Sequence, residues 1–359
     1  MRPLDPAAPR RILVRGTNWV GDAVMTLPAL AALARLCPQA RIEVLARPWV
    51  APIYRASPVR PVVRILEVPG RHSGARGRLR AAAELRREGF HWAVLFQNAL
   101  EAAFIARWAG IPVRVGYSRD ARWWLLSHPV PCGADKRRVH ETAYYLHILH
   151  GAGLPLPPPP DQGVEPELEL EPQDQEWAHQ FLAQRGLEGP LLGLAPGAAF
   201  GPAKCWPAPR FAAAARELAG PGGPFEAVLL FGSRGEAPAC AQVADELEGL
   251  QVVDLAGGTS LGRALALLQR LGAFVTNDSG LMHAAAALGT PTVAVFGSTN
   301  PATTAPLGRR VRIVRHPPEC APCKKPVCPR DLECFQAVSP QEVAQAVGEL
   351  IRGEKGGEP

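Results

Sequence analysis

The stretch F-V-T-N-D-S-G-L-M-H-A-A-A-A-L-G-T-P-T-V-A-V-F-G, residues Phe274–Gly297, decides the fold. Its two ends, Phe274–Thr276 and Thr292–Gly297, are short apolar runs rich in Val, Phe and Thr, which is the composition of buried strands. The Ala-rich run Leu281–Leu288 between them reads as a helix, and the Gly that follows it, with a Pro soon after, is a normal helix stop. The stretch therefore predicts a strand–helix–strand unit of an α/β fold.

The four residues Asn277-Asp278-Ser279-Gly280 lead from the first strand into the helix. The first N–H groups of a helix have no partner within the helix, and its dipole favours negative charge at that end. In an open parallel sheet, ligands also bind at the carboxyl ends of the strands. We therefore expect a diphosphate to bind at this turn.

The same alternation of strands and helices runs along most of the chain, as expected for parallel βαβ units. In the first half we expect strands at 11–15, 42–46, 62–68, 92–96 and 113–117, with helices at 23–36, 79–88 and 100–109. In the second half we expect strands at 191–195, 227–231 and 252–255, with helices at 210–219, 237–247, 261–271 and 339–352.

The segment Leu154–Pro172 interrupts this alternation with four consecutive prolines and then alternating Glu and apolar residues, so we expect a linker. The chain of 359 residues is long for one domain. We predict an N-terminal domain at 1–163, a C-terminal domain at 164–338, and a last helix within 339–359 that packs back towards the N-terminal domain and ends in a frayed tail.

Charge is distributed unevenly between the two halves. Residues 1–160 hold 23 Lys and Arg against 10 Asp and Glu, a charge of +13, while the remainder holds 16 against 23, a charge of −7; together they give the net +6. A basic half indicates an acidic partner such as nucleic acid, anionic lipid or a phosphorylated acceptor. The alternative is a general preference of the source genome for Arg.

Neither an N-terminal signal region nor an apolar run of the roughly 18 residues that span a bilayer is visible in the sequence. We therefore expect a soluble, cytoplasmic protein. In that compartment eight Cys favour free thiols or a metal site over structural disulfides.

The loop Gly16–Asp22 follows the first strand and has the glycine spacing of a phosphate-binding loop, but lacks its Lys and Ser or Thr. It does offer a carboxylate, Asp22, at the carboxyl end of a strand. We interpret Asp22 as a general base for a hydroxyl nucleophile. The alternative is that Asp22 only caps the following helix.

A second loop, Pro196–Pro207, is rich in Gly and Pro and carries a single cation, Lys204. A Lys in this setting is suited to bind a phosphate, although a solvated Lys on an irregular loop is the alternative. Glu236 is a candidate for binding a ribose diol, with a solvated Glu as the alternative. His283, one helical turn past the diphosphate turn, either lines the site or packs in the core.

Four thiols lie within fifteen residues, at Cys320, Cys323, Cys328 and Cys334. Four thiolates can hold a structural Zn²⁺ tetrahedrally. Reduced or partly disulfide-linked cysteines are the alternative.

Three motifs together resemble the lipopolysaccharide heptosyltransferases of glycosyltransferase family 9, most closely their type II members. They are W-V-G-D-A-V-M-T-L-P-A-L (Trp19–Leu30), P-G-A-A-F-G-P-A-K-C-W-P (Pro196–Pro207) and T-N-D-S-G-L-M-H-A-A-A-A-L (Thr276–Leu288). The resemblance runs from about Arg11 to Arg352. It implies a GT-B fold, in which two Rossmann-like domains face each other across a cleft, with the acceptor on the N-terminal domain and ADP-heptose on the C-terminal one.

The resemblance also implies an inverting transfer without a required metal, from ADP-L-glycero-β-D-manno-heptose to heptosyl-Kdo₂-lipid A at the inner face of the cytoplasmic membrane. It implies that Asp22 is the base and that Lys204 neutralises the departing diphosphate. The implied donor-binding residues are Lys204, Glu236, Thr259, Ser260, Leu261, Asp278, Ser279, Gly280, Leu281 and His283, and those on the acceptor side are Thr17, Asn18, Trp19 and Gly21. Candidate docking groups for the acceptor are Arg119, Arg122, Lys136, Arg137 and Arg138, with Trp123 and Trp124.

Several alternatives stay open on the sequence alone. A type I, later-acting or protein-directed heptosyltransferase shares these motifs. A GT-B nucleotide-sugar epimerase or hydrolase would consume the donor without an acceptor. A non-catalytic basic binding protein would not need Asp22, and salt-sensitive nucleic-acid binding would favour it.

Overall fold

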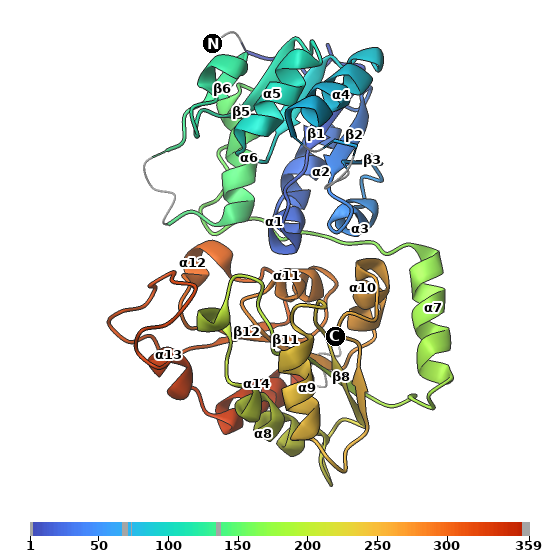
Figure 1. Cartoon of the computed structure of the whole chain (residues 1–359), viewed down its shortest axis with the longest axis vertical. Coiled ribbons are helices and arrows are strands. Elements are labelled where there is room, and N and C mark those ends of the chain that lie inside the picture. Colours follow the sequence, from blue (N-terminus) through green and yellow to red (C-terminus); the bar gives the residue numbers. More distant parts are fainter. Residues whose placement is uncertain (1–2, 67–70, 73, 134–137, 354–359) are drawn as a thin grey trace. The chain divides into compact units, whose positions relative to one another are not determined.

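The computed structural model describes residues 3–66, 71–72, 74–133 and 138–353, and the chain divides into two compact units, Met1–Glu169 and Leu170–Pro359. The division falls inside the segment Leu154–Pro172 that we expected as the linker. Each unit is an α/β layer structure with helices on both faces of a parallel sheet (Figure 1).

The first unit contains a six-stranded sheet in the order β3-β2-β1-β4-β5-β6. Its strands are β1 (Arg11–Arg15), β2 (Arg41–Ala46), β3 (Val62–Ile65), β4 (Trp92–Leu95), β5 (Val113–Tyr117) and β6 (His128–Val130). Its helices are α1 (Val20–Met25), α2 (Leu27–Leu36), α3 (Ala51–Arg55), α4 (Gly74–Arg87), α5 (Leu100–Trp108) and α6 (Glu141–Gly151), with a short 3₁₀ turn, η1 (Trp123–Leu125). Residues 67 and 68 of the strand expected at 62–68 lie outside the described residues.

The single helix expected at 23–36 is two helices, α1 and α2. Thr26 ends the first and caps the second, and its hydroxyl donates a hydrogen bond of 2.7 Å to the carbonyl of Ala23. Pro28 in the first turn of α2 has no N–H, so it cannot continue the helical hydrogen bonds of α1. The break turns α1 into a short element of its own that carries Asp22.

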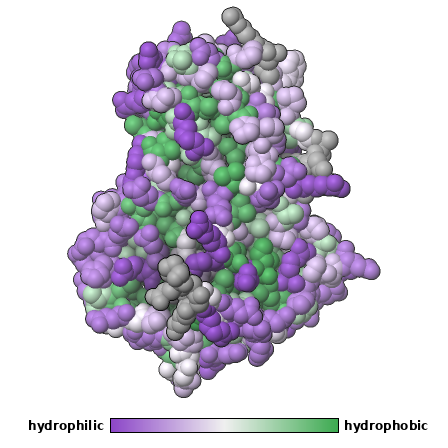
Figure 2. Space-filling model, turned by 180° about the vertical axis from the view of Figure 1, so that it is seen from behind, coloured by the Kyte–Doolittle hydropathy of each residue, from purple (hydrophilic) through white to green (hydrophobic). Residues whose placement is uncertain are grey.

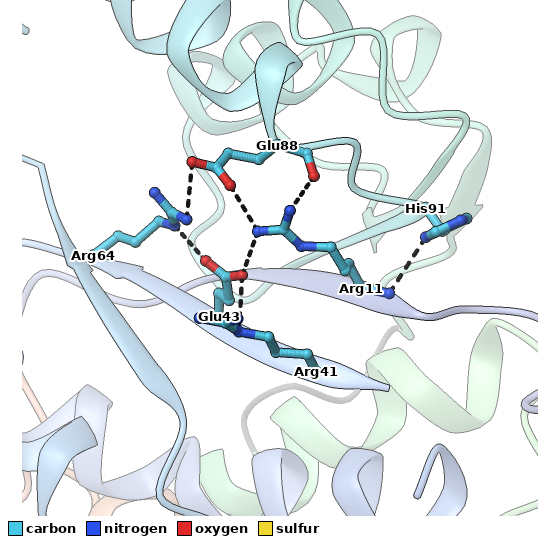
Figure 3. A network of polar contacts seen from close by, with 6 residues as sticks. All are labelled: Arg11, Arg41, Glu43, Arg64, Glu88 and His91. Atoms are coloured by element: carbon cyan, nitrogen blue, oxygen red, sulfur yellow. Dashed lines mark hydrogen bonds and ion pairs between the residues drawn. The ribbon is translucent and has the colours of Figure 1, made fainter. Parts of the chain in front are cut away.

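A network of charged side chains joins the first three strands of this sheet to α4 (Figure 3). The buried carboxylate of Glu43 on β2 accepts a hydrogen bond of 2.6 Å from Arg11 on β1 and another from Arg64 on β3. Glu88, which follows α4, pairs with Arg11 at 2.8 Å and with Arg64 at 3.1 Å. Because a buried carboxylate without partners is costly, this network fixes the register of three strands and the end of α4.

The second unit repeats the topology with a sheet in the order β12-β11-β10-β7-β8-β9. Its strands are β7 (Leu191–Ala195), β8 (Ala227–Leu230), β9 (Val252–Asp254), β10 (Ala273–Asn277), β11 (Thr292–Val295) and β12 (Val311–Val314). Its helices are α7 (Pro172–Ala183), α8 (Ala208–Ala219), α9 (Ala237–Asp245), α10 (Leu261–Gln269), α11 (Gly280–Ala287), α12 (Pro301–Thr304), α13 (Glu333–Gln336) and α14 (Pro340–Arg352), with a 3₁₀ turn, η2 (Pro202–Lys204).

The last helix, α14, corrects one prediction about domain organisation. We expected it to pack back towards the N-terminal domain, but its apolar residues Val343, Ala344 and Val347 are buried in the core of the second unit. There they join β10, β11 and α8. The helix begins with the capping box expected at Ser339 and Glu342, in which each side chain binds the other residue's N–H. Residues 354–359, the expected frayed tail, lie outside the described residues.

Figure 2 shows one face of the molecule, on which hydrophobic and hydrophilic residues are interspersed. Several large hydrophobic side chains are exposed in the first unit, namely Trp19, Trp49, Trp123 and Trp124. Among the helices of the described ranges, none combines the length and apolarity needed to cross a bilayer.

Candidate functional site

Both sheets have the strand order of a dinucleotide-binding fold, in which the direction of strand addition reverses beside the first strand. In the first unit the reversal lies between β1 and β4, and in the second between β7 and β10. Loops that leave neighbouring strands at such a point diverge and leave room for a ligand. The loop of Asp22 follows β1, and those of Lys204 and Asp278 follow β7 and β10, so each candidate lies at the switch point of its own unit.

In the second unit, Lys204 and Asp278 form an ion pair. Lys204 Nζ lies 2.8 Å from Asp278 Oδ2, and the two side chains are 19% and 7% exposed. The ring of Phe200 lies 5.6 Å from the same Nζ. An ammonium group has three donors, so one ion pair does not exhaust its capacity for an anion. The structure thus brings together two of the predicted donor-side residues, which are 74 positions apart in the sequence.

Ser279 caps helix α11, which begins at the end of the predicted diphosphate turn. Its Oγ accepts the N–H of Met282 at 3.4 Å and lies 3.0 Å from Thr276 Oγ1. Gly280 is the first residue of the helix, and Leu281 follows it. The N-terminus of α11 therefore lies at the end of β10, where its N–H groups and dipole favour an anion.

Asn277 was not predicted as a site residue, yet it joins the two loops that we predicted to bind the donor. This fully buried residue accepts the N–H of Trp206 at 2.9 Å and donates to the carbonyl of Pro196 at 2.7 Å. These are the two ends of the Lys204 loop. One amide side chain at the end of β10 therefore holds that loop beside the α11 turn.

Glu236 lies against the beginning of the Lys204 loop. Its carboxylate accepts the N–H of Ser233 at 2.8 Å, and a Cβ on Gly197 would come within 2.6 Å of its side chain. Only a Gly at 197 leaves this space. The structure thus places Glu236 beside the loop of the predicted phosphate-binding cation.

The remaining donor-side candidates lie at helix starts in the same unit. Ser260 caps α10 and accepts the N–H of Arg263 at 3.4 Å, Thr259 donates to the carbonyl of Leu255 at 3.2 Å, and Leu261 begins the helix. His283 is buried in the first turns of α11, 5% exposed.

In the first unit, Asp22 is the third residue of α1, and Trp19 is the cap. The alternative that Asp22 serves as the N-cap is therefore wrong. Its carboxylate lies near enough to Tyr145 on α6 to affect it: burial first, and then the charge of Asp22, raise the pKa of Tyr145 well above its ordinary value. Asp22 thus lies on a short helix, near the buried phenol of Tyr145.

The loop that we predicted to lie on the acceptor side is held by residues that were not singled out from the sequence. The N–H of Thr17 donates to the hydroxyl of Tyr54 at 3.0 Å, and the carbonyl of Asn18 accepts from Trp49 Nε1 at 2.7 Å. Arg15 is buried and donates to Asn18 Oδ1 at 3.1 Å, and its burial lowers its pKa to about 10. A charged residue ending the apolar strand R-I-L-V-R was the available signal. Trp19 is 62% exposed beside these anchors, and Gly21 lies in α1.

One proposed docking group is a structural residue. Arg122 is fully buried and donates to the carbonyl oxygens of Tyr117, at 2.9 Å, and Gln97, and to Asn98 Oδ1 at 2.8 Å. Burial lowers its pKa to about 10. Its neighbours Trp123 and Trp124 are exposed, whereas Lys136 and Arg137 lie outside the described residues.

The four clustered cysteines are free thiols. Cys328 Sγ accepts the N–H groups of Arg330 and Leu332, both at 3.4 Å, and Cys334 is buried. Within the described ranges no three or more His, Cys, Asp or Glu side chains are grouped so that they could hold a metal ion. The structure therefore adds no support for zinc at Cys320, Cys323, Cys328 and Cys334, and that assignment stays a prediction.

Comparisons with known proteins show the family of the chain. Residues 78–332 match the family described as glycosyltransferase family 9 (heptosyltransferase). The chain is 35% identical to lipooligosaccharide heptosyltransferase 2 of Haemophilus influenzae, over 85% of this chain and 88% of that one. It is 33% identical to lipopolysaccharide heptosyltransferase 2 of Escherichia coli, over the same shares.

Solved structures of related proteins have the same fold. The E. coli ADP-heptose LPS heptosyltransferase II superposes with a TM-score of 0.78 at 29% identity, covering 96% of this chain and 99% of that one. A family 9 glycosyltransferase of Veillonella parvula superposes with a TM-score of 0.83 at 21% identity, covering 98% and 100%. The expected α/β class with two Rossmann-like domains of the GT-B fold is thus confirmed. The chain is a glycosyltransferase and belongs to glycosyltransferase family 9, the heptosyltransferase family.

Proposed function

We propose that this glycosyltransferase moves L-glycero-D-manno-heptose from ADP-heptose to the inner-core heptose of Kdo₂-lipid A. The names of its relatives support this assignment, since those of 33–35% identity are heptosyltransferases 2. The observation that carries the donor side is the Lys204–Asp278 ion pair beside the N-terminus of α11. An ammonium and a helix N-terminus together suit a diphosphate.

In this proposal the second unit binds the donor through its switch-point loops. The N–H groups at Ser279, Gly280 and Leu281 hold the diphosphate, while Lys204 faces its developing charge. Asp278 orients Lys204 and contacts heptose hydroxyls. Glu236 takes the ribose, and the turn of Thr259 and Ser260 lies near the adenine.

The transfer itself is a single inverting displacement. The acceptor hydroxyl attacks C1 of the heptose and passes its proton to Asp22 as the new C–O bond forms. The bond from C1 to the diphosphate oxygen breaks, and ADP leaves with the electron pair. Lys204 and the α11 N-terminus stabilise that charge, an effect for which single donors contribute about 10²–10³ in rate. A cation and a helix dipole at the leaving group make a metal unnecessary to this mechanism.

The acceptor side rests on the first unit. Thr17, Asn18, Trp19 and Gly21 belong to the loop and helix that present Asp22. We assign the phosphorylated acceptor to this unit because residues 1–160 carry the charge of +13. The exposed rings of Trp123 and Trp124 suit the interface of a membrane, and we place the enzyme at the inner face of the cytoplasmic membrane.

The test is ADP release from ADP-heptose by purified protein, with Kdo₂-lipid A that carries or lacks its first heptose. We expect release only with the heptosylated acceptor. Release with the bare Kdo acceptor would keep the chemistry but make this a type I enzyme. Release without any acceptor would favour a hydrolase, and no release with either acceptor would contradict the proposal.

A further inference from the structure

A long loop connects β12 to α13 in the second unit (Figure 1), and its backbone forms two hydrogen bonds with segments near the predicted donor site. The N–H of Lys324 donates to the carbonyl of Ser298 at 2.9 Å. Two residues on, the carbonyl of Pro326 accepts the N–H of Ala203 at 3.1 Å. Ala203 directly precedes Lys204. We call Lys324–Pro326 the strap; two of the clustered cysteines, Cys323 and Cys328, stand near its ends.

The strap acts through its main chain and not through its side chains. Lys324, Lys325 and Pro326 all have exposed side chains. Lys324 adopts a φ of 54°, in the left-handed region that a non-Gly residue rarely visits. Such a conformation persists only where the surroundings fix it, and here it directs the Lys324 N–H at Ser298.

The surface that receives the strap on the Lys204 loop requires a glycine. Gly201 has a φ of 137°, and a Cβ there would lie 2.6 Å from the carbonyl oxygen of Pro326. The N–H of Lys204 in turn donates to the carbonyl of Gly201 at 3.1 Å. A change in the distance between the strap and Gly201 should therefore shift the backbone of Lys204.

The other anchor of the strap is equally close-packed. Ser298 follows β11, whose neighbour β10 leads into Asp278. A Cβ on Gly297 would lie 2.6 Å from the ring of Phe335 and 2.8 Å from Cys334 Sγ, so helix α13, which follows the loop, packs closely against this point. The strap thus bridges the end of β11 and the loop that carries Lys204.

We propose that the strap is a positioning element for Lys204, which sets where the ammonium meets the leaving diphosphate. This inference rests on the proposed role of Lys204. The strap touches neither Lys204 Nζ nor Asp278 in any hydrogen bond that the described residues make, so it acts on the position of the loop.

The first test compares Gly201→Ala with Gly222→Ala. Both glycines have positive φ, but a Cβ on Gly222 meets nothing within 4 Å. Both variants place a Cβ at positive φ, but only Gly201→Ala adds the clash with Pro326, and its φ of 137° with ψ of 170° also costs more than the φ of 81° at Gly222. We expect kcat for heptose transfer to fall about tenfold or more in Gly201→Ala only, since a misplacement near 1 Å can cost about a hundredfold. Acceptor KM should not change, and kcat is compared at a temperature well below the melting temperature of Gly201→Ala, which we expect to be the lower of the two.

A double-variant comparison then separates positioning from a general loss of structure. In a Lys204→Met background, Gly201→Ala should change kcat less than about twofold, because the group that it displaces is gone. An equal loss in both backgrounds would overturn the inference, as would wild-type kcat in Gly201→Ala. If Lys204→Met itself kept wild-type kcat, the proposed role of Lys204 would fail instead, which is a separate result.

A second pair of variants acts on the other anchor and does not depend on Gly201→Ala folding. Lys324→Pro removes the N–H given to Ser298 and cannot adopt a φ of 54°, whereas Lys324→Gly keeps both. Both remove the same charge. We expect kcat to fall in Lys324→Pro and to stay near wild type in Lys324→Gly. Equal kcat values in these two variants would overturn the inference.

Discussion

Lys204 Nζ and Asp278 Oδ2 lie 2.8 Å apart and join the loops that follow β7 and β10, on the two sides of the switch point. Asp278 is nearly buried, and its position is fixed by the turn into α11. The pair therefore aims one cation at the place where the α11 N-terminus also favours an anion. Two separate sources of positive potential meet at one ligand position.

Replacing Lys204 should slow transfer more than it weakens donor binding. We expect Lys204→Met to lower kcat by about 10²–10³, the cost of losing one donor to a developing charge, and Lys204→Arg to lose less. The control is Arg309→Met, an exposed cation just before β12 and so at the opposite edge of the sheet. Steady-state ADP release measures both. Equal activity of Lys204→Met and Arg309→Met would contradict the assigned role.

Asn277 should matter for both stability and donor binding, because it holds the two ends of the Lys204 loop. Asn277→Leu leaves a buried N–H and a buried carbonyl without their partner, at a cost of about 1–3 kcal/mol each. We expect a lower melting temperature and a higher KM for the donor. Thermal melts with and without ADP check this. A stable variant with unchanged donor KM would show that the loop does not need Asn277.

Part of the acid sensitivity of the first unit should come from Glu88. The hydrogen bond from Arg11 holds the pKa of Glu88 below its ordinary value, and the charge of Arg64 lowers it further. A carboxylate with a lower pKa in the folded state adds stability above its unfolded pKa of about 4.3 and loses it as the pH falls through the folded value. Glu88→Gln should therefore flatten the decline in unfolding free energy below about pH 4.5. Denaturant titrations against Glu217→Gln, an exposed carboxylate on α8, are the comparison.

Variants of Arg122 and of the exposed tryptophans beside it should have opposite effects on stability and on membrane binding. Arg122→Met leaves one buried and two partly buried acceptors without a donor, so we expect loss of stability with little change in binding to anionic vesicles per folded molecule. Trp123→Ala with Trp124→Ala should do the reverse. Vesicle sedimentation and thermal melting distinguish the two. Weaker vesicle binding by folded Arg122→Met would show that Arg122 contributes to membrane docking after all.

The sequence was most informative where a strand ends and a helix begins. The patterns around Asp22, Lys204 and Asp278 place each residue just after the carboxyl end of a strand. Such a position depends only on neighbouring residues, so a single sequence can reveal it. Helix α6 was not expected, because its residues Tyr144, Leu146 and Ile148 are buried on several sides and leave no polar face to mark the helical period. Strand β12 was not expected either, because it is only four residues long and contains an Arg.

Contacts between distant parts of the chain were beyond the reach of sequence patterns. Asn277 binds Trp206 across 71 positions, and the strap meets the Lys204 loop across more than a hundred. Arg122 stands beside two exposed tryptophans in a basic stretch, and only the structure reveals that its guanidinium is buried. Such side chains are fixed by packing between elements, and a single sequence carries no record of that packing.

The most direct test of the account is ADP release by Asp22→Asn with ADP-heptose and heptosyl-Kdo₂-lipid A. The control is Asp120→Asn, which neutralises an exposed carboxylate in the same unit. We predict that Asp22→Asn lowers kcat by about 10²–10⁴, the contribution of a general base, and keeps ADP binding, while Asp120→Asn remains active. Transfer at the wild-type rate by Asp22→Asn would contradict the assignment of Asp22 as the base and with it the proposed mechanism.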